Sequence, residues 1–324
     1  MRLLAVDDDP LILDLLPIVF RQANLPQVTV ASSGQAALEM VSEPDAEFDC
    51  LILDIEMPGM SGIELCEQVR KLPRYRNTPI LMLTAVTDRV RIERAFAAGA
   101  DDYITKPFDV KEIATRVRVA QRMTDRSVHA PILDTRAVNL DDIPGAHRFE
   151  VTDPVRLAHT PQLILPFALG NYLSQLSRRR LDDCSIFAAR IEGIETFYNG
   201  CKPHEFARLL DRTVRAIAEV VDWPHALMAY EGNGLILCIT QGAEAPAWPE
   251  MEDRICEALA GDTTVFDDQS PLRIDISVGN PIMPNASRNQ RVKKTFDRAR
   301  DRLNTREKIK DKQPGGHGAG THRS

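Results

Sequence analysis

Short aliphatic runs alternate with segments of helical length over the first third of the chain. The runs lie at residues 3–6, 28–31, 50–53, 80–83 and 103–104. Alternation of this kind favours a parallel sheet covered by helices. Local boundary signals agree, because Asp9 precedes a proline at a helix start, Ser33 can cap the second helix and Gly99 can close the fourth. We therefore predict a doubly wound α/β domain over residues 1–123.

The rest of the chain follows a different order. Residues 124–165 contain several prolines and little helical periodicity, which predicts a linker, and a helix is expected over 162–181. Further strands are expected at 185–191, 226–230, 235–240 and 272–278, and further helices at 203–221, 248–259 and 291–306. This βαββαβ order predicts an α+β domain over residues 166–306, a split βαβ sheet with helices on one face.

The last residues, 307–324, are rich in glycine and charge and have no apolar face, which predicts a disordered tail. His317 and His322 in this tail are too loosely spaced to indicate a metal site. Three histidines of the predicted linker, His129, His147 and His159, are expected to be solvent-exposed without a functional role.

Composition places the chain among globular proteins. Of its 324 residues 44% are hydrophobic and 27% are charged, which suits about two domains. The apolar stretches are too short to span a membrane, and three aspartates by position 9 argue against a secretory signal, so a cytoplasmic location is expected. The six cysteines show no metal-binding spacing and are expected to be reduced core residues. A net charge of −7 lacks the basic footprint of nucleic-acid binding.

Polar residues follow the predicted strands of the first domain where each strand ends. Asp7 and Asp8 follow the first strand, Asp54 the third, Thr84 ends the fourth and Lys106 follows the fifth. In a parallel sheet these ends meet at one edge. Carboxylates so close repel one another unless a cation lies among them, and oxygen ligands favour Mg²⁺. One of the carboxylates could then attack a phosphoryl group, with the metal and Lys106 neutralising charge on the transferred oxygens.

Four motifs in the same region, VDDDP, ILDIEMPGMSG, LMLTA and DDYITKPF, resemble the receiver domain of two-component response regulators. The resemblance covers residues 1–123 and implies a flavodoxin-like (βα)5 fold. It implies that Asp54 is the phosphoacceptor. Asp7, Asp8, Asp54 and the backbone carbonyl of Glu56 would hold Mg²⁺.

The same resemblance implies further roles. Thr84 and Tyr103 would be the switch pair that responds to phosphorylation, and Lys106 would contact the acyl phosphate through a loop with a cis peptide bond before Pro107. The side chain of Glu56 is either a surface acid or a group that reaches the water shell of the metal and tunes loss of the phosphoryl group.

The second domain carries fragments RIEGIETFYN, AYEGNGLILCI, LRIDISVG and TFDRARDRL, which resemble the ferredoxin-like superfold of nucleotide cyclases. This superfold is shared by GGDEF diguanylate cyclases and class III adenylate and guanylate cyclases. The third and fourth fragments favour a GGDEF domain, whereas the first two suit either family.

The second domain departs from these families where their metals bind. Arg190 stands at the first metal position and Asn233 at the second, and Gly234 replaces the neighbouring glutamate. Glu195 and Ala229 likewise replace a lysine and an arginine. A guanidinium repels Mg²⁺, so we expect no enzyme activity from this domain. The Gly-Asn-Gly sequence around Asn233 also suits a tight turn.

Glu192 lies two residues from Arg190 on the same strand face, so pairing between the two side chains is expected.

These observations predict a response regulator that receives a phosphoryl group from a histidine kinase or a phosphotransfer protein. The receiver would only phosphorylate and dephosphorylate itself, and the inactive second domain would signal by protein contact or as a homodimer. An active diguanylate or adenylate cyclase under receiver control, or a sensor that binds a nucleotide without turnover, are the alternatives. A transcription factor fits less well, because the second domain is net negative and shows no recognition helix.

Overall fold

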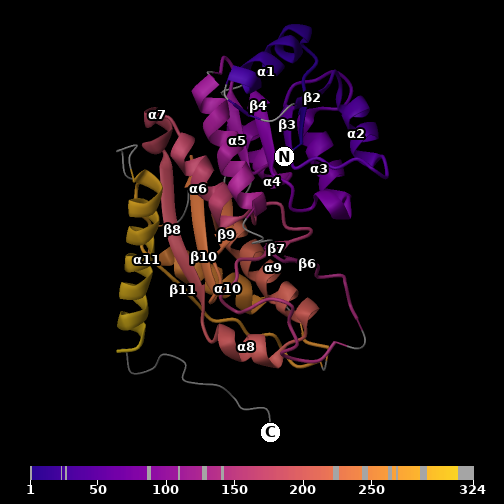
Figure 1. Ribbon diagram of the computed structural model, residues 1–324. Helices are drawn as coiled ribbons and strands as arrows, with labels where there is room; N and C mark the ends of the chain where they lie inside the picture. The colour runs from indigo at the N-terminus through magenta and orange to yellow at the C-terminus, as the bar shows by residue number, and fades with distance from the viewer. Residues whose placement is uncertain are drawn as a thin grey trace. The chain divides into compact units, whose positions relative to one another are not determined.

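The chain divides into two compact units, Met1–Pro131 and Ile132–Ser324. The computed structural model describes residues 2–22, 24–25, 28–85, 89–108, 110–125, 130–139, 142–221, 226–242, 247–261, 265–267, 269–284 and 290–312. Figure 1 labels the helices and strands of both units. No helix within the described residues is both long and apolar enough to cross a bilayer.

The first unit is built on a five-stranded parallel sheet. Its strands are β1 (Leu3–Val6), β2 (Val28–Ala31), β3 (Cys50–Asp54), β4 (Ile80–Thr84) and β5 (Asp102–Thr105). They lie in the order β2-β1-β3-β4-β5, with every neighbouring pair parallel. The prediction of a doubly wound, flavodoxin-like fold for this unit is confirmed. β1, β3 and β4 are fully buried, as their continuous apolar runs require.

Five α-helices accompany this sheet: α1 (Pro10–Gln22), α2 (Gly34–Ser42), α3 (Gly62–Lys71), α4 (Arg89–Ala97) and α5 (Val110–Asp125). A 3₁₀ turn, η1 (Pro73–Tyr75), follows α3. Apolar residues of α1 and α5 share one core cluster with the strands, while α3 packs beside α2 and α4. The Asp9 carboxylate accepts a hydrogen bond from the backbone N–H of Leu11 (2.9 Å), and Ser33 caps α2 through the N–H of Ala36 (3.2 Å).

The second unit contains a four-stranded antiparallel sheet. Its strands are β8 (Cys184–Ile191), β9 (Ala226–Tyr230), β10 (Leu235–Gln241) and β11 (Ile276–Val278), in the order β11-β8-β10-β9. β10 is antiparallel to both β8 and β9. β8 and β9 are therefore parallel to each other with β10 between them, which is a split βαβ arrangement.

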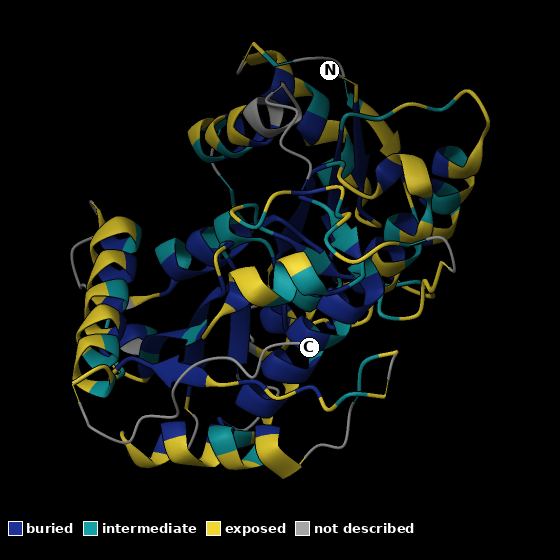
Figure 2. Ribbon diagram, turned by 90° about the horizontal axis from the view of Figure 1, so that it is seen from below, coloured by how far each residue is buried: buried dark blue, intermediate teal, exposed yellow. Residues whose placement is uncertain are grey.

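Helices cover both faces of this sheet, whereas the sequence analysis placed them on one. α9 (Pro203–Val220) and α10 (Glu250–Gly261) share a core cluster with one face. α6 (Pro166–Gln175) contacts β9 and β10, and α11 (Arg291–Lys310) contacts β8, on the other. The physical reason lies in β10, whose seven residues are all buried, so neither face of the strand is left to solvent. Figure 2 shows buried residues along the sheet strands and exposed ones on the outer sides of the helices.

The structure contains two short helices that the hydrophobic pattern does not predict. The predicted helix over 162–181 is divided into α6 and α7 (Arg178–Leu181), because the backbone of Leu176 and Ser177 is not helical. α8 (Ile194–Gly200) follows β8 directly and begins after Gly193, whose φ is +64°.

The predicted linker over 124–165 differs most from the structure, because residues 132–165 belong to the second unit. β6 (Ile132–Leu133) pairs with β7 (Arg156–Leu157), and Phe149, Val155 and Leu163 are buried in the core of that unit. Because these apolar side chains are buried in its core, residues 132–165 are part of the second unit. What connects the two units is therefore shorter than predicted.

One histidine of this segment, His147, departs from the predicted solvent exposure. The ring of His147 lies 4.3 Å from that of Tyr198 and 5.5 Å from that of Phe206, and its Nε2 is 2.7 Å from the Tyr198 carbonyl. Burial lowers the pKa of His147. His159 is exposed, as predicted, and lies 3.6 Å from the Asp134 carboxylate, whereas His129 is outside the described residues.

At the C-terminal end, α11 continues to Lys310, past the predicted boundary at 306. Residues 313–324, with His317 and His322, lie outside the described residues, so the predicted tail stays a prediction there.

Replacing Phe149 with alanine tests whether residues 132–165 stabilise the second unit. Phe149 is 7% exposed and packs against Phe206 and Tyr198. We therefore expect Phe149→Ala to lower the free energy of unfolding of the second unit by about 3 to 5 kcal/mol. Both tryptophans of the chain lie in this unit, so urea unfolding followed by tryptophan fluorescence reports on it selectively. Val138→Ala is the control, since Val138 lies in the same segment and is 58% exposed. Equal midpoints for the two variants would contradict the assignment.

Candidate functional site

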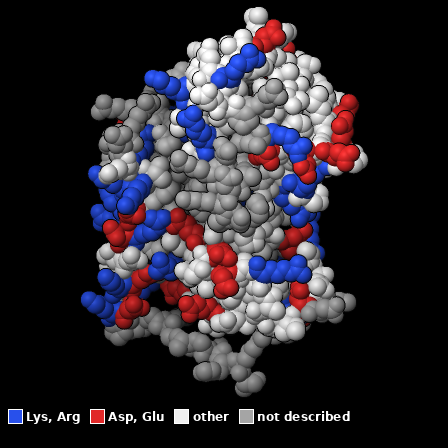
Figure 3. Space-filling model, in the orientation of Figure 1, with Lys and Arg blue, Asp and Glu red and all other residues white. Residues whose placement is uncertain are grey.

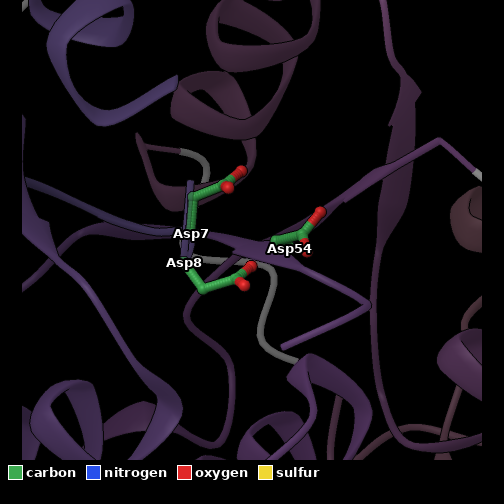
Figure 4. Close-up of side chains that lie close together, drawn as sticks. All are labelled: Asp7, Asp8 and Asp54. Atoms are coloured by element: carbon green, nitrogen blue, oxygen red, sulfur yellow. The ribbon is translucent and has the colours of Figure 1, made fainter. Parts of the chain in front are cut away.

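Three carboxylates meet at one edge of the parallel sheet. Asp7 follows β1, Asp8 comes next, and Asp54 ends β3. One oxygen from each lies within 4.8 Å of the others, and Figure 4 shows the three side chains close together. β1 and β3 pair in parallel, residue for residue from Leu3 with Cys50, so their carboxyl ends reach the edge together.

Lys106 lies against two of these carboxylates. Its Nζ is 2.6 Å from an oxygen of Asp7 and 2.6 Å from an oxygen of Asp54. The residue follows β5, and its backbone N–H donates to the Thr84 carbonyl at 2.7 Å. The expected cis peptide bond between Lys106 and Pro107 is present. Burial works against the ammonium, but bonding to Asp54 and Asp7 outweighs it, and the pKa of Lys106 is raised.

Burial of Asp54, the candidate phosphoacceptor, opposes its ionisation. Asp54 is 4% exposed, and its pKa is raised from 3.8 to about 6. Desolvation is the largest cause; Lys106 acts in the opposite direction, while the charges of Asp7 and Asp8 add to the rise. The site therefore stores electrostatic repulsion that a bound cation would relieve.

The donor set fits a divalent metal ion. Three carboxylates face one ammonium, which leaves an excess of negative charge, and every candidate ligand atom is oxygen. Hard ions such as Mg²⁺ prefer these ligands. The backbone N–H of Glu56 donates to Asp54 Oδ2 at 3.1 Å, which fixes this loop beside the carboxylates. A ligand role for the Glu56 carbonyl stays a prediction.

The side chain of Glu56 forms an ion pair with Arg91 of α4. This partner was not foreseen, because nothing in the sequence relates residues 35 positions apart on different elements. The pair connects the loop after Asp54 to α4, and both side chains are about half exposed.

Thr84 and Tyr103 are both buried. Thr84, 1% exposed, ends β4 beside the carboxylate edge, and Tyr103 lies on β5. The Tyr103 ring packs edge to face on Phe96 of α4, with the centroids 6.1 Å apart. Thr84 thus lies beside the carboxylates, and Tyr103 packs against α4. Their role as a switch pair stays a prediction.

Gly62 is a further residue of this site that the sequence analysis left out. A Cβ on Gly62 would lie 1.9 Å from the backbone oxygen of Asp54. The chain around Asp54 can therefore approach the start of α3 only because residue 62 has no side chain. Its place as the last residue of ILDIEMPGMSG is the signal that could have identified it.

In the second unit, the positions singled out by sequence line one pocket. Arg190 and Glu192 come from the end of β8, Asn233 from the β9–β10 turn, and Glu195 from α8. Residues 232–234 all have positive φ, as a Gly-Asn-Gly turn requires. Gly234 approaches the Ile191 carbonyl so closely that a Cβ would lie 2.7 Å from it, and Ala229 is buried within β9.

The expected pairing of Arg190 with Glu192 is wrong. The Arg190 guanidinium donates to the Glu307 carboxylate at 2.9 Å, and Glu192 accepts from Lys310 at 3.0 Å and from Ser277 at 2.7 Å. α11 packs along β8 and offers each side chain an opposite charge from the helix, which sequence spacing on one strand could not reveal.

Comparison with known proteins bears on the first unit. A family model described as the response regulator receiver domain matches residues 3–118. The chain is 38% identical over 145 residues to the DNA-binding dual master transcriptional regulator RpaA of Synechocystis sp., covering 43% of this chain and 58% of that protein. It is 41% identical over 124 residues to the DNA-binding response regulator MtrA of Mycolicibacterium smegmatis, covering 38% and 52%.

This chain thus spans about half the length of the curated relatives it matches. Among solved structures, a response regulator from Chloroflexus aurantiacus is 40% identical, with 37% of this chain and 97% of that chain covered and a TM-score of 0.35. The family model ends before the second unit begins.

Replacing Asp54 with asparagine should stabilise the first unit when no metal is bound. The folded chain binds the Asp54 proton more tightly than the unfolded chain, so ionisation lowers stability as pH rises from about 4 to about 6. Asp54→Asn removes this loss, and we expect it to raise the free energy of unfolding by about 1 to 3 kcal/mol at pH 7, with little effect near pH 4.

Hydrogen exchange of the most protected amides of β1 and β3, in the presence of a chelator, measures this difference. Asp9→Asn is the matched control, because Asp9 is exposed, lies in the same loop and can cap α1 equally well as asparagine. An advantage of Asp54→Asn that is equal at pH 4 and pH 7 would show that the Asp54 charge is not its cause.

Proposed function

Residues 3–118 form a response regulator receiver domain, and we propose that Asp54 accepts a phosphoryl group from a histidine kinase or a phosphotransfer protein. The observation that carries this proposal is the meeting of Asp54 with Asp7, Asp8 and Lys106 at one edge of the sheet. Two-component signalling through this domain follows from its family.

The residues divide the chemistry among them. An ionised oxygen of Asp54 attacks phosphorus, an O–P bond forms, and the N–P bond to the donor histidine breaks with its electron pair returning to the imidazole. Lys106 already touches Asp54 and would exchange that contact for an oxygen of the transferred group. Asp7, Asp8, Asp54 and the Glu56 carbonyl would hold Mg²⁺, which neutralises charge on the phosphoryl oxygens when bound.

Signalling after phosphorylation would pass through Thr84 and Tyr103. Thr84 ends the strand next to β3, within the same edge as Asp54. Tyr103 packs on Phe96 of α4, so a movement of the β4 end can reach that helix through packed side chains. The modified state would then present a repacked surface to a partner protein.

For the second unit we propose a nucleotide-cyclase-like domain without catalytic activity, which signals by protein contact or as a homodimer. The split βαβ order of its sheet supports this relation. At the positions that correspond to metal ligands in the resemblance, Arg190 is held in an ion pair and Asn233 lies in a tight turn. A positive guanidinium at such a position opposes binding of two metal ions.

DNA binding is the second candidate for the whole protein, because the names of the similar regulators describe it. This chain matches only about half the length of those proteins, so DNA binding stands as an alternative proposal for it. A promoter shift that depends on phosphorylation would favour it over protein contact.

Phosphorylation of Asp54 is tested with acetyl phosphate or a cognate histidine kinase in the presence of Mg²⁺. We expect stoichiometric labelling of the wild-type chain and Asp9→Asn, and loss of at least ~90% of the label in Asp54→Asn, because the asparagine amide is not a nucleophile for phosphorus. Intact-protein mass spectrometry measures the fraction labelled. Label that persists in Asp54→Asn would refute the assignment of the acceptor.

Incubation of the full chain with GTP and with ATP, each with Mn²⁺, tests the absence of cyclase activity. We expect chromatography to detect no cyclic product from either the phosphorylated or the unphosphorylated chain, because Arg190 and Asn233 cannot replace two metal-binding carboxylates. Cyclic dinucleotide or cyclic mononucleotide in any reaction would overturn the proposal of an inactive domain. Calorimetry with the same nucleotides separates binding without turnover from no binding.

A further inference from the structure

The last helix of the second unit is anchored unevenly. Its buried side chains all belong to its first 13 residues: Arg291, Thr295, Phe296, Ala299 and Leu303. Beyond Leu303, every described residue of α11 is exposed or half-buried. Apolar burial, which salt does not screen, therefore ends two turns before the helix does.

Charged contacts hold the final two turns. Arg306 donates to Glu252 at 2.7 Å and lies over the Trp248 ring, and Lys310 donates to the Ile276 carbonyl at 2.8 Å. Along the left edge of Figure 3, over α11, basic and acidic side chains alternate.

The charges of β8 and α11 are complementary in order. β8 presents the cation of Arg190 and then the anion of Glu192, and α11 presents the anion of Glu307 and then the cation of Lys310. The two pairs fix one register of helix on strand, because a shift of one turn would bring like charges together.

These turns also form one wall of the pocket described above. Glu307, Lys310 and Asp311 line it together with Arg190, Asn233 and Ser277 from the sheet side. Ser277 is 1% exposed and donates to Glu192, so its hydroxyl lies behind the contacts that the helix end makes.

We propose that residues 304–310, the end segment of α11, act as a polar lid that controls access to this pocket and opens about Leu303. The Arg190–Glu307 and Glu192–Lys310 pairs are partly exposed and are screened by salt, whereas Arg306–Glu252 is nearly buried and is screened less; Phe296 and Leu303 keep the rest of the helix on the sheet. Opening separates Arg190 from Glu307, Glu192 from Lys310 and Arg306 from Glu252, and it exposes the floor of the pocket at Ser277. The lid does not depend on phosphorylation of Asp54 or on cyclase ancestry.

Hydrogen exchange of the full chain with peptide-level mass spectrometry tests the lid. In Glu307→Gln we expect amides 305–312 to exchange about 5- to 10-fold faster than in the wild type, with amides 292–303 unchanged. Raising NaCl from about 0.1 M to about 1 M should have the same local effect on the wild type. Lys308→Gln is the matched control, since Lys308 is an exposed charge on the same turn, and it should exchange as the wild type does.

Thiol labelling measures access to the pocket. Ser277→Cys is nearly isosteric, and its rate of alkylation, followed by peptide mass, should rise about 5- to 10-fold when Glu307→Gln is added. Combining Arg190→Glu with Glu307→Arg should restore slow labelling, because the pair is re-formed with its charges exchanged.

Three results would overturn the proposal: faster exchange along all of α11, equal exchange in Glu307→Gln and Lys308→Gln, or labelling of Ser277→Cys that does not change when Glu307→Gln is added. The first would mean that the helix moves as a whole, the second that its end frays regardless of Arg190, and the third that the helix end does not cover the pocket.

Discussion

Parallel pairing of β3 with β1 and with β4 is the constraint on which the first unit depends. It brings the ends of three buried strands to one edge and so forces Asp7 and Asp54 together in a place where water cannot separate their charges. Lys106, delivered by the neighbouring β5, offsets part of the repulsion. The remaining negative charge is what makes the edge suited to a divalent cation and to phosphoryl chemistry.

The second unit uses charge differently. Its sheet is covered on both faces, so apolar burial supplies much of the stability, and two of its ion pairs lie where α11 meets the end of β8. Arg190 and Glu192 are each paired with a residue of that helix, and most residues that line the pocket beside them are polar. In the first unit, three carboxylates face one ammonium and leave an excess of negative charge. In the second unit, Arg190 and Glu192 each have a partner of opposite charge, and the pairs hold α11 in place on β8.

Hydrophobic patterning was sufficient for the strands of the two main sheets and for most helices, because most of these strands are buried and long helices such as α9 carry one apolar face. It was insufficient for residues 132–165. There the buried residues, such as Leu133, Phe149 and Val155, are far apart in sequence and show no sustained period of two or of 3.6. Phe149 packs on Phe206 and Tyr198, which lie about 50 residues further along the chain.

The sequence by itself determined the parallel sheet of the first unit and the five polar residues at its edge, because strand ends in such a sheet converge whatever the details of packing. Tertiary structure alone decided which charges pair, as Glu56 with Arg91, Arg190 with Glu307 and Glu192 with Lys310 show. These partners come from elements far apart in sequence, and the Coulomb attraction between them acts only after apolar packing has brought the elements together.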